Sequence, residues 1–259
     1  MNMLKLNSNN YVTLHLVDDQ KRPFVLIAPG GGYIRTSPRE AEPIAKAFNE
    51  KGYHAGTIYY RESFLTHPQA VEELSGFMDL IVSMDLPIDQ NALILCGFSS
   101  GGHYMANLGV HTEYHQKYKI KAMVLAYPVL TGQKGFAHED SIRRLYGEIT
   151  DETRLKFSLE TKVTNTTPAT FLFHTIDDET VKVENSLFFM EALRQHHVIV
   201  DCHLYHSGIH GLSLGTEEVP REEFASDPKG YAKIHSHNQT WFSLAISFLN
   251  KILESNSNE

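Results

Sequence analysis

The sequence is most constrained by the run from Leu93 to Gly102, which reads LILCGFSSGG. It leads an apolar strand into a Gly-x-Ser-x-Gly turn, and residues 103–108 then have helix-compatible composition. This order is the sequence form of a nucleophile elbow. A serine at so sharp a turn is strained, and side chains in place of Gly97 and Gly101 would clash with it. Because glycine and serine are common in turns, the pattern also fits an ordinary strand-to-helix turn.

Strand-like and helix-like segments alternate along the chain. The expected strands are 23–28, 54–60, 92–96, 121–127, 169–174 and 198–205, with a weaker edge strand at 11–17, and the expected helices are 37–52, 68–84, 185–195 and 240–253. The strands are continuous apolar runs, which is typical of strands buried on both faces. We therefore expect residues 1–259 to form a single α/β domain, with a mostly parallel central sheet covered by helices on both faces.

Two segments interrupt this alternation. Residues 131–168 are polar with short helical patches, and residues 212–237 are acidic and irregular. We expect them to be insertions that form a small cap over the carboxyl edge of the sheet, where loops shape a pocket. At the first expected helix, Ser37 as N-cap and Glu40 three residues later predict a capping box.

Charge and hydropathy exclude several classes of partner. The formal net charge is -8 and lysines and arginines are not clustered, which argues against nucleic acid. No apolar run is long enough to span a membrane, and the polar segment 1–11 does not resemble a signal peptide. We expect a cytoplasmic protein with a small-molecule partner, and a homodimer remains an open option. Cys96 and Cys202 lie in apolar runs and are expected to be buried thiols, not a disulfide.

A serine hydroxyl needs an imidazole to take its proton, and a carboxylate to orient that imidazole. The strand 169–174 leads to Asp177 and Asp178, and the strand 198–205 leads to His210. Asp178 is favoured over Asp177 because it stands three residues before Val181, which can anchor the loop. His210 is favoured over His203 and His206 because it lies in a loop between Gly208 and Gly211. The predicted catalytic residues are Ser99, Asp178 and His210.

The glycine run after the first buried strand predicts an oxyanion hole. The backbone N–H groups of Gly31 or Gly32, with that of Ser100, could donate to a substrate oxygen, and glycine allows the close approach. A phosphate cradle is the competing interpretation. It is set aside because Arg35 stands where a dinucleotide-binding motif needs glycine, and no Gly-Lys-Ser/Thr is present. No cofactor is expected.

The chain has 15 histidines, which are common metal ligands, so their spacing bears on metal binding. His111 and His115 are four residues apart with Glu113 between them, but a zincin motif needs glutamate directly after the first histidine, where Thr112 stands. We therefore interpret this segment as a solvated helix face and predict no metal.

Taken together, several motifs resemble the α/β-hydrolase superfamily, and within it the acetyl-xylan-esterase-like and hormone-sensitive-lipase-like esterases. They are Pro-Gly-Gly-Gly-Tyr at 29–33, Tyr-Arg at 60–61, Gly-Phe-Ser-Ser-Gly-Gly-His at 97–103, Tyr-Pro at 127–128, the run 168–174 leading to Asp178, and Gly-Ile-His-Gly at 208–211. The resemblance implies Ser99 as nucleophile, Asp178 and His210 as its partners, and the glycine run as oxyanion hole. Pro29 favours the acetyl-xylan-esterase-like branch.

The sequence therefore predicts a serine carboxylesterase that cleaves short-chain, acetyl-type esters through an acyl-enzyme, with acetylated carbohydrate as one substrate class. Tyr33, Tyr60 and Arg61 are candidates for substrate contacts, although structural roles fit them equally. Two alternatives stay open: a serine peptidase or amidase on the same fold, and a hydrolase-like binding protein without catalysis. Fold alone does not select a substrate.

Overall fold

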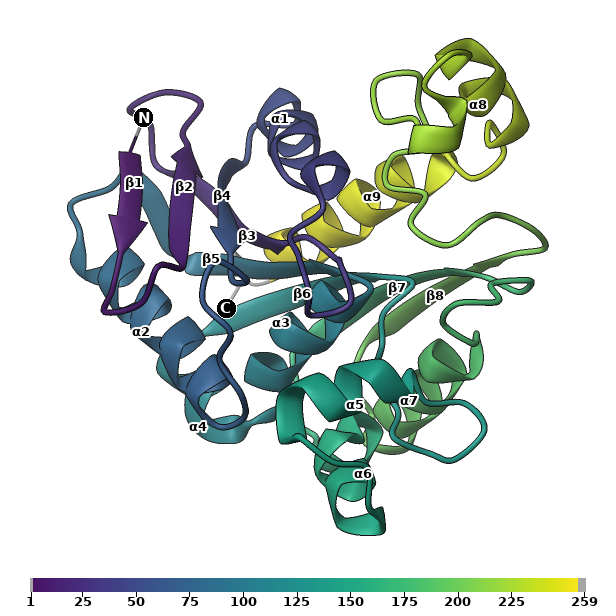
Figure 1. Cartoon of the computed structure of the whole chain (residues 1–259). Coiled ribbons are helices and arrows are strands. Elements are labelled where there is room, and N and C mark those ends of the chain that lie inside the picture. The colour runs from purple at the N-terminus through teal and green to yellow at the C-terminus, as the bar shows by residue number, and fades with distance from the viewer. Residues whose placement is uncertain (1, 256–259) are drawn as a thin grey trace.

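A computed structural model describes residues 2–255, and its centre is an eight-stranded sheet (Figure 1). The strands are β1 (Asn2–Lys5), β2 (Tyr11–His15), β3 (Arg22–Ala28), β4 (His54–Tyr59), β5 (Ile88–Phe98), β6 (Ile120–Ala126), β7 (Ala169–Thr175) and β8 (Val200–Tyr205). Their order is β1-β2-β4-β3-β5-β6-β7-β8. β1 pairs antiparallel with β2 and β2 with β4, and the pairs from β4 to β8 are parallel. The mostly parallel sheet is as predicted.

Helices cover both faces of this sheet. They are α1 (Glu42–Glu50), α2 (Gln69–Ser83), α3 (Ser100–Val110), α4 (Thr112–Lys117), α5 (Glu139–Tyr146), α6 (Asp151–Phe157), α7 (Glu184–Gln195), α8 (Pro228–Ile234) and α9 (Thr240–Ser255). Side chains of α1 and α9 build one core, and those of α2, α3 and α7 build the other, on the opposite face (Figure 1). The central strands are buried on both faces, which is why their sequences are continuously apolar.

Two local predictions are wrong. The strand at 11–17 is not an edge strand, because β1 pairs outside it. Ser37 and Glu40 do not form a capping box: Ser37 makes no side-chain capping bond, and residues Pro38–Glu40 form a short 3-10 turn (η1) before α1. Glu40 is buried instead, and its carboxylate accepts hydrogen bonds from the Gly30 N–H (2.8 Å) and the Tyr127 hydroxyl (2.6 Å). Gly30 lies 10 residues and Tyr127 lies 87 residues from Glu40 along the chain, so the local pattern at the start of a helix does not reveal these bonds.

The two segments that break the alternation pack on opposite faces of the sheet. Residues 131–168 contain α5, α6 and the 3-10 turn η2 (Leu159–Lys162), and Ile142 and Phe157 join the core beneath α2 and α3. Residues 212–237 contain the 3-10 turn η3 (Glu222–Phe224) and α8, and Leu214 and Val219 join the core of α1 and α9. The carboxyl ends of the parallel strands thus receive loops from both sides.

Candidate active site

Ser99 occupies the junction between β5 and α3 with φ 51° and ψ -120°, a left-handed conformation that is strained for serine. The two flanking glycines explain how the chain can make this turn. A Cβ on Gly97 would lie 2.4 Å from the Gly101 carbonyl oxygen, and one on Gly101 would lie 2.1 Å from that of Ala28. Both contacts are prohibitive, so the Gly-x-Ser-x-Gly spacing is a steric requirement of the turn.

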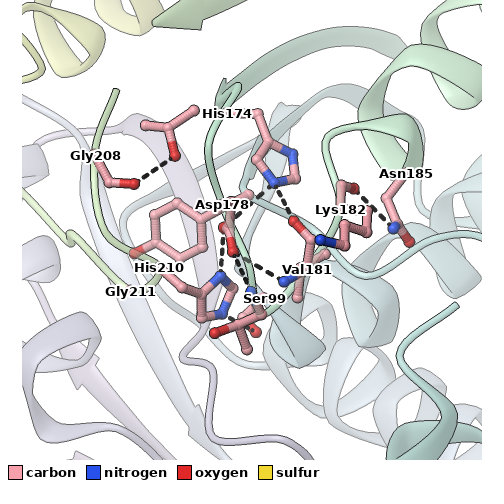
Figure 2. Close-up of polar contacts among 12 residues, drawn as sticks. Ser99, His174, Asp178, Val181, Lys182, Asn185, Gly208, His210 and Gly211 are labelled. Atoms are coloured by element: carbon pink, nitrogen blue, oxygen red, sulfur yellow. Dashed lines mark hydrogen bonds and ion pairs between the residues drawn. The ribbon is translucent and has the colours of Figure 1, made fainter. Parts of the chain in front are cut away.

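The structure brings Ser99, His210 and Asp178 together (Figure 2). The Ser99 hydroxyl lies 2.8 Å from His210 Nε2, and His210 Nδ1 lies 2.7 Å from Asp178 Oδ2. Since a carboxylate only accepts, Nδ1 carries the proton, and Nε2 is left to accept the proton of the serine. Ser99 is 8% exposed, which leaves it within reach of a small substrate.

Asp178 follows β7 and is held by its own loop. Its Oδ1 accepts hydrogen bonds from the backbone N–H groups of Thr180 and Val181, both at 2.9 Å. Burial by itself would raise the pKa of the Asp178 carboxyl, but hydrogen bonds from His174 and His210 hold that pKa well below its usual range. Asp178 is therefore an anion beside the imidazole. Asp177 is exposed and accepts from the Gly208 N–H at 2.8 Å, away from His210.

A second histidine, His174, supports Asp178 from the end of β7. The fully buried ring donates from Nε2 to the Val181 carbonyl oxygen at 3.0 Å, and the same nitrogen lies 3.4 Å from Asp178 Oδ2 (Figure 2). Its Nδ1 lies 2.8 Å from the Ser186 hydroxyl, which can donate to it. His174 thus joins the acid loop to α7. In the sequence, His174 is visible only as the last residue of the run 168–174.

The loop that carries His210 is fixed by glycine geometry and by Tyr127. Gly208 and Gly211 have φ 157° and 74°, and a Cβ on Gly208 would lie 2.7 Å from the Thr175 side chain. The Tyr127 ring packs edge-on against the His210 ring, with centroids 5.1 Å apart. The Tyr127 hydroxyl donates to Glu40 and accepts from the Ser213 N–H at 2.8 Å, so it ties the histidine loop to η1. Sequence reasoning assigned no role to this tyrosine.

The glycine run lies beside Ser99 with free donors. Gly31 and Gly32 have φ 136° and 63°, and their backbone N–H groups have no hydrogen-bond acceptor among residues 2–255. The N–H of Ser100 stands at the first turn of α3, where helical N–H groups have no intrahelical partner. Arg144 of α5 donates to the Gly32 carbonyl oxygen at 2.6 Å and fixes the loop. The three predicted oxyanion donors thus surround the nucleophile's turn.

Tyr33, Tyr60 and Arg61 lie beneath the glycine run and do not line the cavity beside Ser99. Tyr33 and Tyr60 are 1% and 2% exposed. The Tyr33 hydroxyl lies 2.9 Å from His103 Nδ1, and the Tyr60 hydroxyl donates to the Pro29 carbonyl oxygen at 2.8 Å. Arg61 stacks between the rings of Tyr33 and Phe64. These positions agree with the structural role that the sequence left open for the three residues, and contact with substrate stays a prediction.

Two adjoining cavities open at the catalytic residues. The smaller, of about 230 Å³, is lined by Ser99, the glycine run and His210, together with His138 of the first insertion and Arg221 of the second. The larger, of about 500 Å³, extends past Asp177 toward His235 and His237. Thr180, His210 and Arg221 line both. A bound molecule can therefore extend to either side of His210.

His111 and His115 make local contacts, and His111 Nδ1 lies 2.6 Å from the Asn107 carbonyl oxygen. His115 is buried and its Nε2 lies 3.2 Å from the Thr166 hydroxyl, so the expectation of a solvated face is wrong for this residue. Over residues 2–255, no group of three or more His, Cys, Asp or Glu side chains is arranged to hold a metal ion.

In the same part of the chain, residues 2–255, no helix combines the length and apolar character needed to cross a membrane. Cys96 and Cys202 are both free thiols.

Comparison with known proteins adds the family. The profile of the BD-FAE family matches residues 12–193. Endo-1,4-beta-xylanase B of Butyrivibrio fibrisolvens is 34% identical over 226 residues, which are 81% of this chain but 35% of the xylanase. Acetylxylan esterase of Xylanibacter ruminicola is 25% identical over 224 residues, 79% of this chain and 46% of that protein. The chain thus spans less than half the length of either relative.

A solved structure similar to this chain is the acetyl ester-xyloside bifunctional hydrolase from Caldicellulosiruptor lactoaceticus. It has a TM-score of 0.80 and 30% identity, over 94% of this chain and 88% of that one. The carboxylesterase Cest-2923 of Lactobacillus plantarum has a TM-score of 0.81 and 27% identity, over 96% of both chains. From the family match and these structures we conclude that this chain belongs to the BD-FAE family and has the α/β-hydrolase fold of the esterase group.

Proposed function

We propose that this chain is a serine carboxylesterase that hydrolyses short-chain, acetyl-type esters through an acyl-enzyme. The observation that carries the proposal is the continuous hydrogen-bonded chain from Ser99 through His210 to Asp178. Beside it lie the N–H groups of Gly31 and Gly32, which have no acceptor among residues 2–255. The names of similar proteins, an acetylxylan esterase and a carboxylesterase, agree with ester hydrolysis.

The proposed reaction has two halves. Ser99 Oγ attacks the ester carbonyl carbon while its proton passes to His210 Nε2, and the developing oxyanion accepts hydrogen bonds from the glycine run and the Ser100 N–H. His210 then gives this proton to the leaving alcohol oxygen, and the acyl group stays on Ser99. A water molecule, deprotonated by His210, releases the acid and restores the serine. The anionic Asp178 stabilises the positive imidazolium in both halves.

The smaller cavity supports a short acyl group. Its volume of about 230 Å³ lies below the roughly 300 to 1,000 Å³ that is usual for sites of drug-sized ligands. The adjoining cavity of about 500 Å³ offers room for a larger alcohol half, such as a sugar. Acetylated carbohydrate is therefore our proposed substrate class, and the name of the acetylxylan esterase relative points the same way.

Two neighbouring serines provide a matched test. Ser99→Ala should lower hydrolysis of p-nitrophenyl acetate by about 10⁴-fold or more, because it removes the nucleophile. Ser100→Ala should retain most of the activity, since its backbone N–H remains and its buried hydroxyl is hydrogen-bonded to the Tyr33 N–H and the Tyr60 hydroxyl. Wild-type rates in Ser99→Ala would refute the mechanism. A matched amide substrate tests the peptidase alternative, and covalent labelling by a fluorophosphonate probe tests the non-catalytic one.

A further inference from the structure

The cavity beside Ser99 has a charge opposite to that of the chain. The whole sequence carries a formal net charge of -8. The lining of this cavity nevertheless includes three arginines, Arg35, Arg39 and Arg221, and a single carboxylate, Glu40. A concave site lined by one sign of charge raises the local concentration of ligands of the other sign. This cavity therefore favours an anion.

Most of these charged groups are already engaged. Both oxygens of Glu40 accept hydrogen bonds, from the Gly30 N–H and the Tyr127 hydroxyl. The Arg39 guanidinium donates to backbone carbonyl oxygens, Gly211 among them at 2.8 Å, and to the Tyr231 hydroxyl. Arg221 pairs with Glu223 at 3.0 Å. These bonds hold the loops together. They leave Glu40, Arg39 and Arg221 little remaining capacity to bind a ligand.

Arg35 is the exception. Its side chain is exposed, lines the cavity, and makes no hydrogen bond or ion pair with any residue from 2 to 255. Because it is exposed and unpaired among these residues, its positive guanidinium can offer five N–H donors to a molecule in the cavity. A guanidinium with this freedom matches the two oxygens of a carboxylate, which it can bind through two parallel hydrogen bonds.

The backbone of Arg35 is fixed to the glycine run. Its N–H donates to the Gly31 carbonyl oxygen at 3.3 Å, and a Cβ on Gly31 would lie 2.1 Å from the Arg35 carbonyl oxygen. The same turn presents the Gly31 and Gly32 N–H groups beside Ser99. A carboxylate bound by Arg35 therefore lies within the length of one arginine side chain from the turn that carries these donors.

We propose that Arg35 is a specificity-determining residue and that, among short-chain esters, the preferred substrate carries a carboxylate on whichever half, acyl or alcohol, reaches this side chain. This inference rests on the proposed esterase function and extends it to a substrate class. Arg35 binds the carboxylate in the ground state and in the transition state alike, so it acts on kcat/KM chiefly through KM.

Two isosteric pairs test this inference, one for each half of the ester. Acetates of 4-hydroxybenzoate and 4-hydroxybenzamide place the carboxylate or its neutral amide in the alcohol half. The monoethyl ester of succinic acid and the ethyl ester of succinamic acid place them in the acyl half. Hydrolysis is followed in a pH-stat, and the ratio of kcat/KM for carboxylate to amide is compared between wild type and variants, so that intrinsic reactivity cancels.

We expect Arg35→Gln to lower this ratio about five- to tenfold for at least one pair, as loss of a charge-assisted hydrogen bond predicts. Arg35→Lys should restore part of it, because the charge remains without the planar fork. Raising NaCl from 50 to 500 mM should weaken the wild-type preference. Arg143→Gln is the matched control: this exposed arginine on α5 does not line the cavity, so the ratio should stay at the wild-type value.

The two proposals fail in different ways. Equal ratios in wild type, Arg35→Gln and Arg143→Gln, with Ser99-dependent hydrolysis intact, overturn the carboxylate preference and leave the esterase function standing. Absence of Ser99-dependent hydrolysis of any ester in the panel overturns both. An equal fall in Arg35→Gln and Arg143→Gln assigns the effect to overall charge and also overturns a specific role of Arg35.

Discussion

At the residue scale, two adjacent aspartates occupy different environments. Asp178 is buried and accepts from His210 Nδ1, whereas Asp177 is exposed and accepts from the Gly208 N–H. The two side chains thus point in different directions. The Asp178 carboxylate faces the imidazole of His210, and the Asp177 carboxylate faces the Gly208 N–H. The sequence favoured Asp178 through Val181, and Val181 is indeed buried, with its N–H on Asp178 Oδ1.

This difference gives a prediction. Asp178→Asn should lower kcat for p-nitrophenyl acetate on the order of 10³- to 10⁴-fold, because an amide can hold His210 in the wrong tautomer and cannot stabilise its charged form. Asp177→Asn should lower kcat by less than about fivefold, since an amide oxygen can still accept from Gly208. Steady-state kinetics of both variants measure these effects. Comparable losses of kcat in the two variants would show that Asp178 is not the carboxylate that orients His210.

At the element scale, α5 of the first insertion reaches the glycine run through Arg144. The helix was expected only as part of a polar insertion, and its sequence does not reveal its partner. The bond from Arg144 to the Gly32 carbonyl oxygen fixes the peptide that follows Gly32, and with it the direction of the neighbouring N–H groups. The insertion therefore holds the proposed oxyanion donors in place.

Loss of this bond should affect chemistry more than binding. We expect Arg144→Gln to lower kcat roughly ten- to a hundredfold with little change in KM for p-nitrophenyl acetate, because misplaced donors weaken transition-state stabilisation. The neighbouring Arg143→Gln should be close to wild type, since Arg143 pairs with Asp140 on the surface. A rise in KM with unchanged kcat would show that Arg144 binds substrate and does not position the loop.

At the scale of the whole molecule, Arg39 joins the second insertion to η1, the turn that precedes α1. Its guanidinium donates to Gly211 O at 2.8 Å, to Val219 O at 2.8 and 3.0 Å, and to the Tyr231 hydroxyl at 3.0 Å. Residues some 170 to 190 positions apart in the sequence thus share one side chain. These contacts anchor the loop of His210 as well as α8.

Arg39→Gln should loosen this insertion. We expect a loss of about 2 to 4 kcal/mol in the free energy of unfolding, because several buried carbonyl groups lose a charged donor. Amide hydrogen exchange should accelerate selectively over residues 211–231. Arg194→Gln, which removes an exposed arginine of α7, is the control and should change neither quantity measurably. Uniform acceleration throughout the chain would contradict a local anchoring role.

The pH dependence of stability reports on another buried contact. Burial lowers the pKa of His103 from 6.5 to about 3, with its Nδ1 near the Tyr33 hydroxyl and its Nε2 donating to the Phe157 carbonyl oxygen. A folded-state pKa below the unfolded value means that the unfolded chain binds more protons. Stability is therefore full above pH 6.5 and falls as the pH drops toward 3.

From pH 6.5 to 4 this histidine alone should remove about 3 kcal/mol from the free energy of unfolding. His103→Phe should be less stable at pH 8, because Tyr33 and the Phe157 carbonyl lose a partner. Its loss between pH 6.5 and 4 should be smaller than that of wild type by up to that amount. Urea unfolding at four pH values measures the free energy of unfolding of both proteins. An equal loss in wild type and in His103→Phe between pH 6.5 and 4 would show that His103 does not cause the pH dependence.

The features that depend on local sequence were predictable. Continuous apolar runs determined the parallel strands, since a strand buried on both faces has no polar side. The glycine spacing around Ser99 determined the turn, since a Cβ at either glycine meets backbone oxygen. Ser99, Asp178 and His210 follow the ends of β5, β7 and β8, and they could be expected to meet because parallel strands bring their carboxyl ends to one edge.

Only the tertiary structure decided what the remaining polar residues do. Glu40 matched a helix cap in sequence, yet it bonds Gly30 and Tyr127, because a buried carboxylate takes its partners from whichever strands and loops surround it. Three candidates for substrate contact pack beneath the glycine run: Tyr33, Tyr60 and Arg61. Arg35 was noticed only as a break in a phosphate-binding pattern. Its exposure in the cavity arises because long-range packing engages the neighbouring charges and leaves this one free.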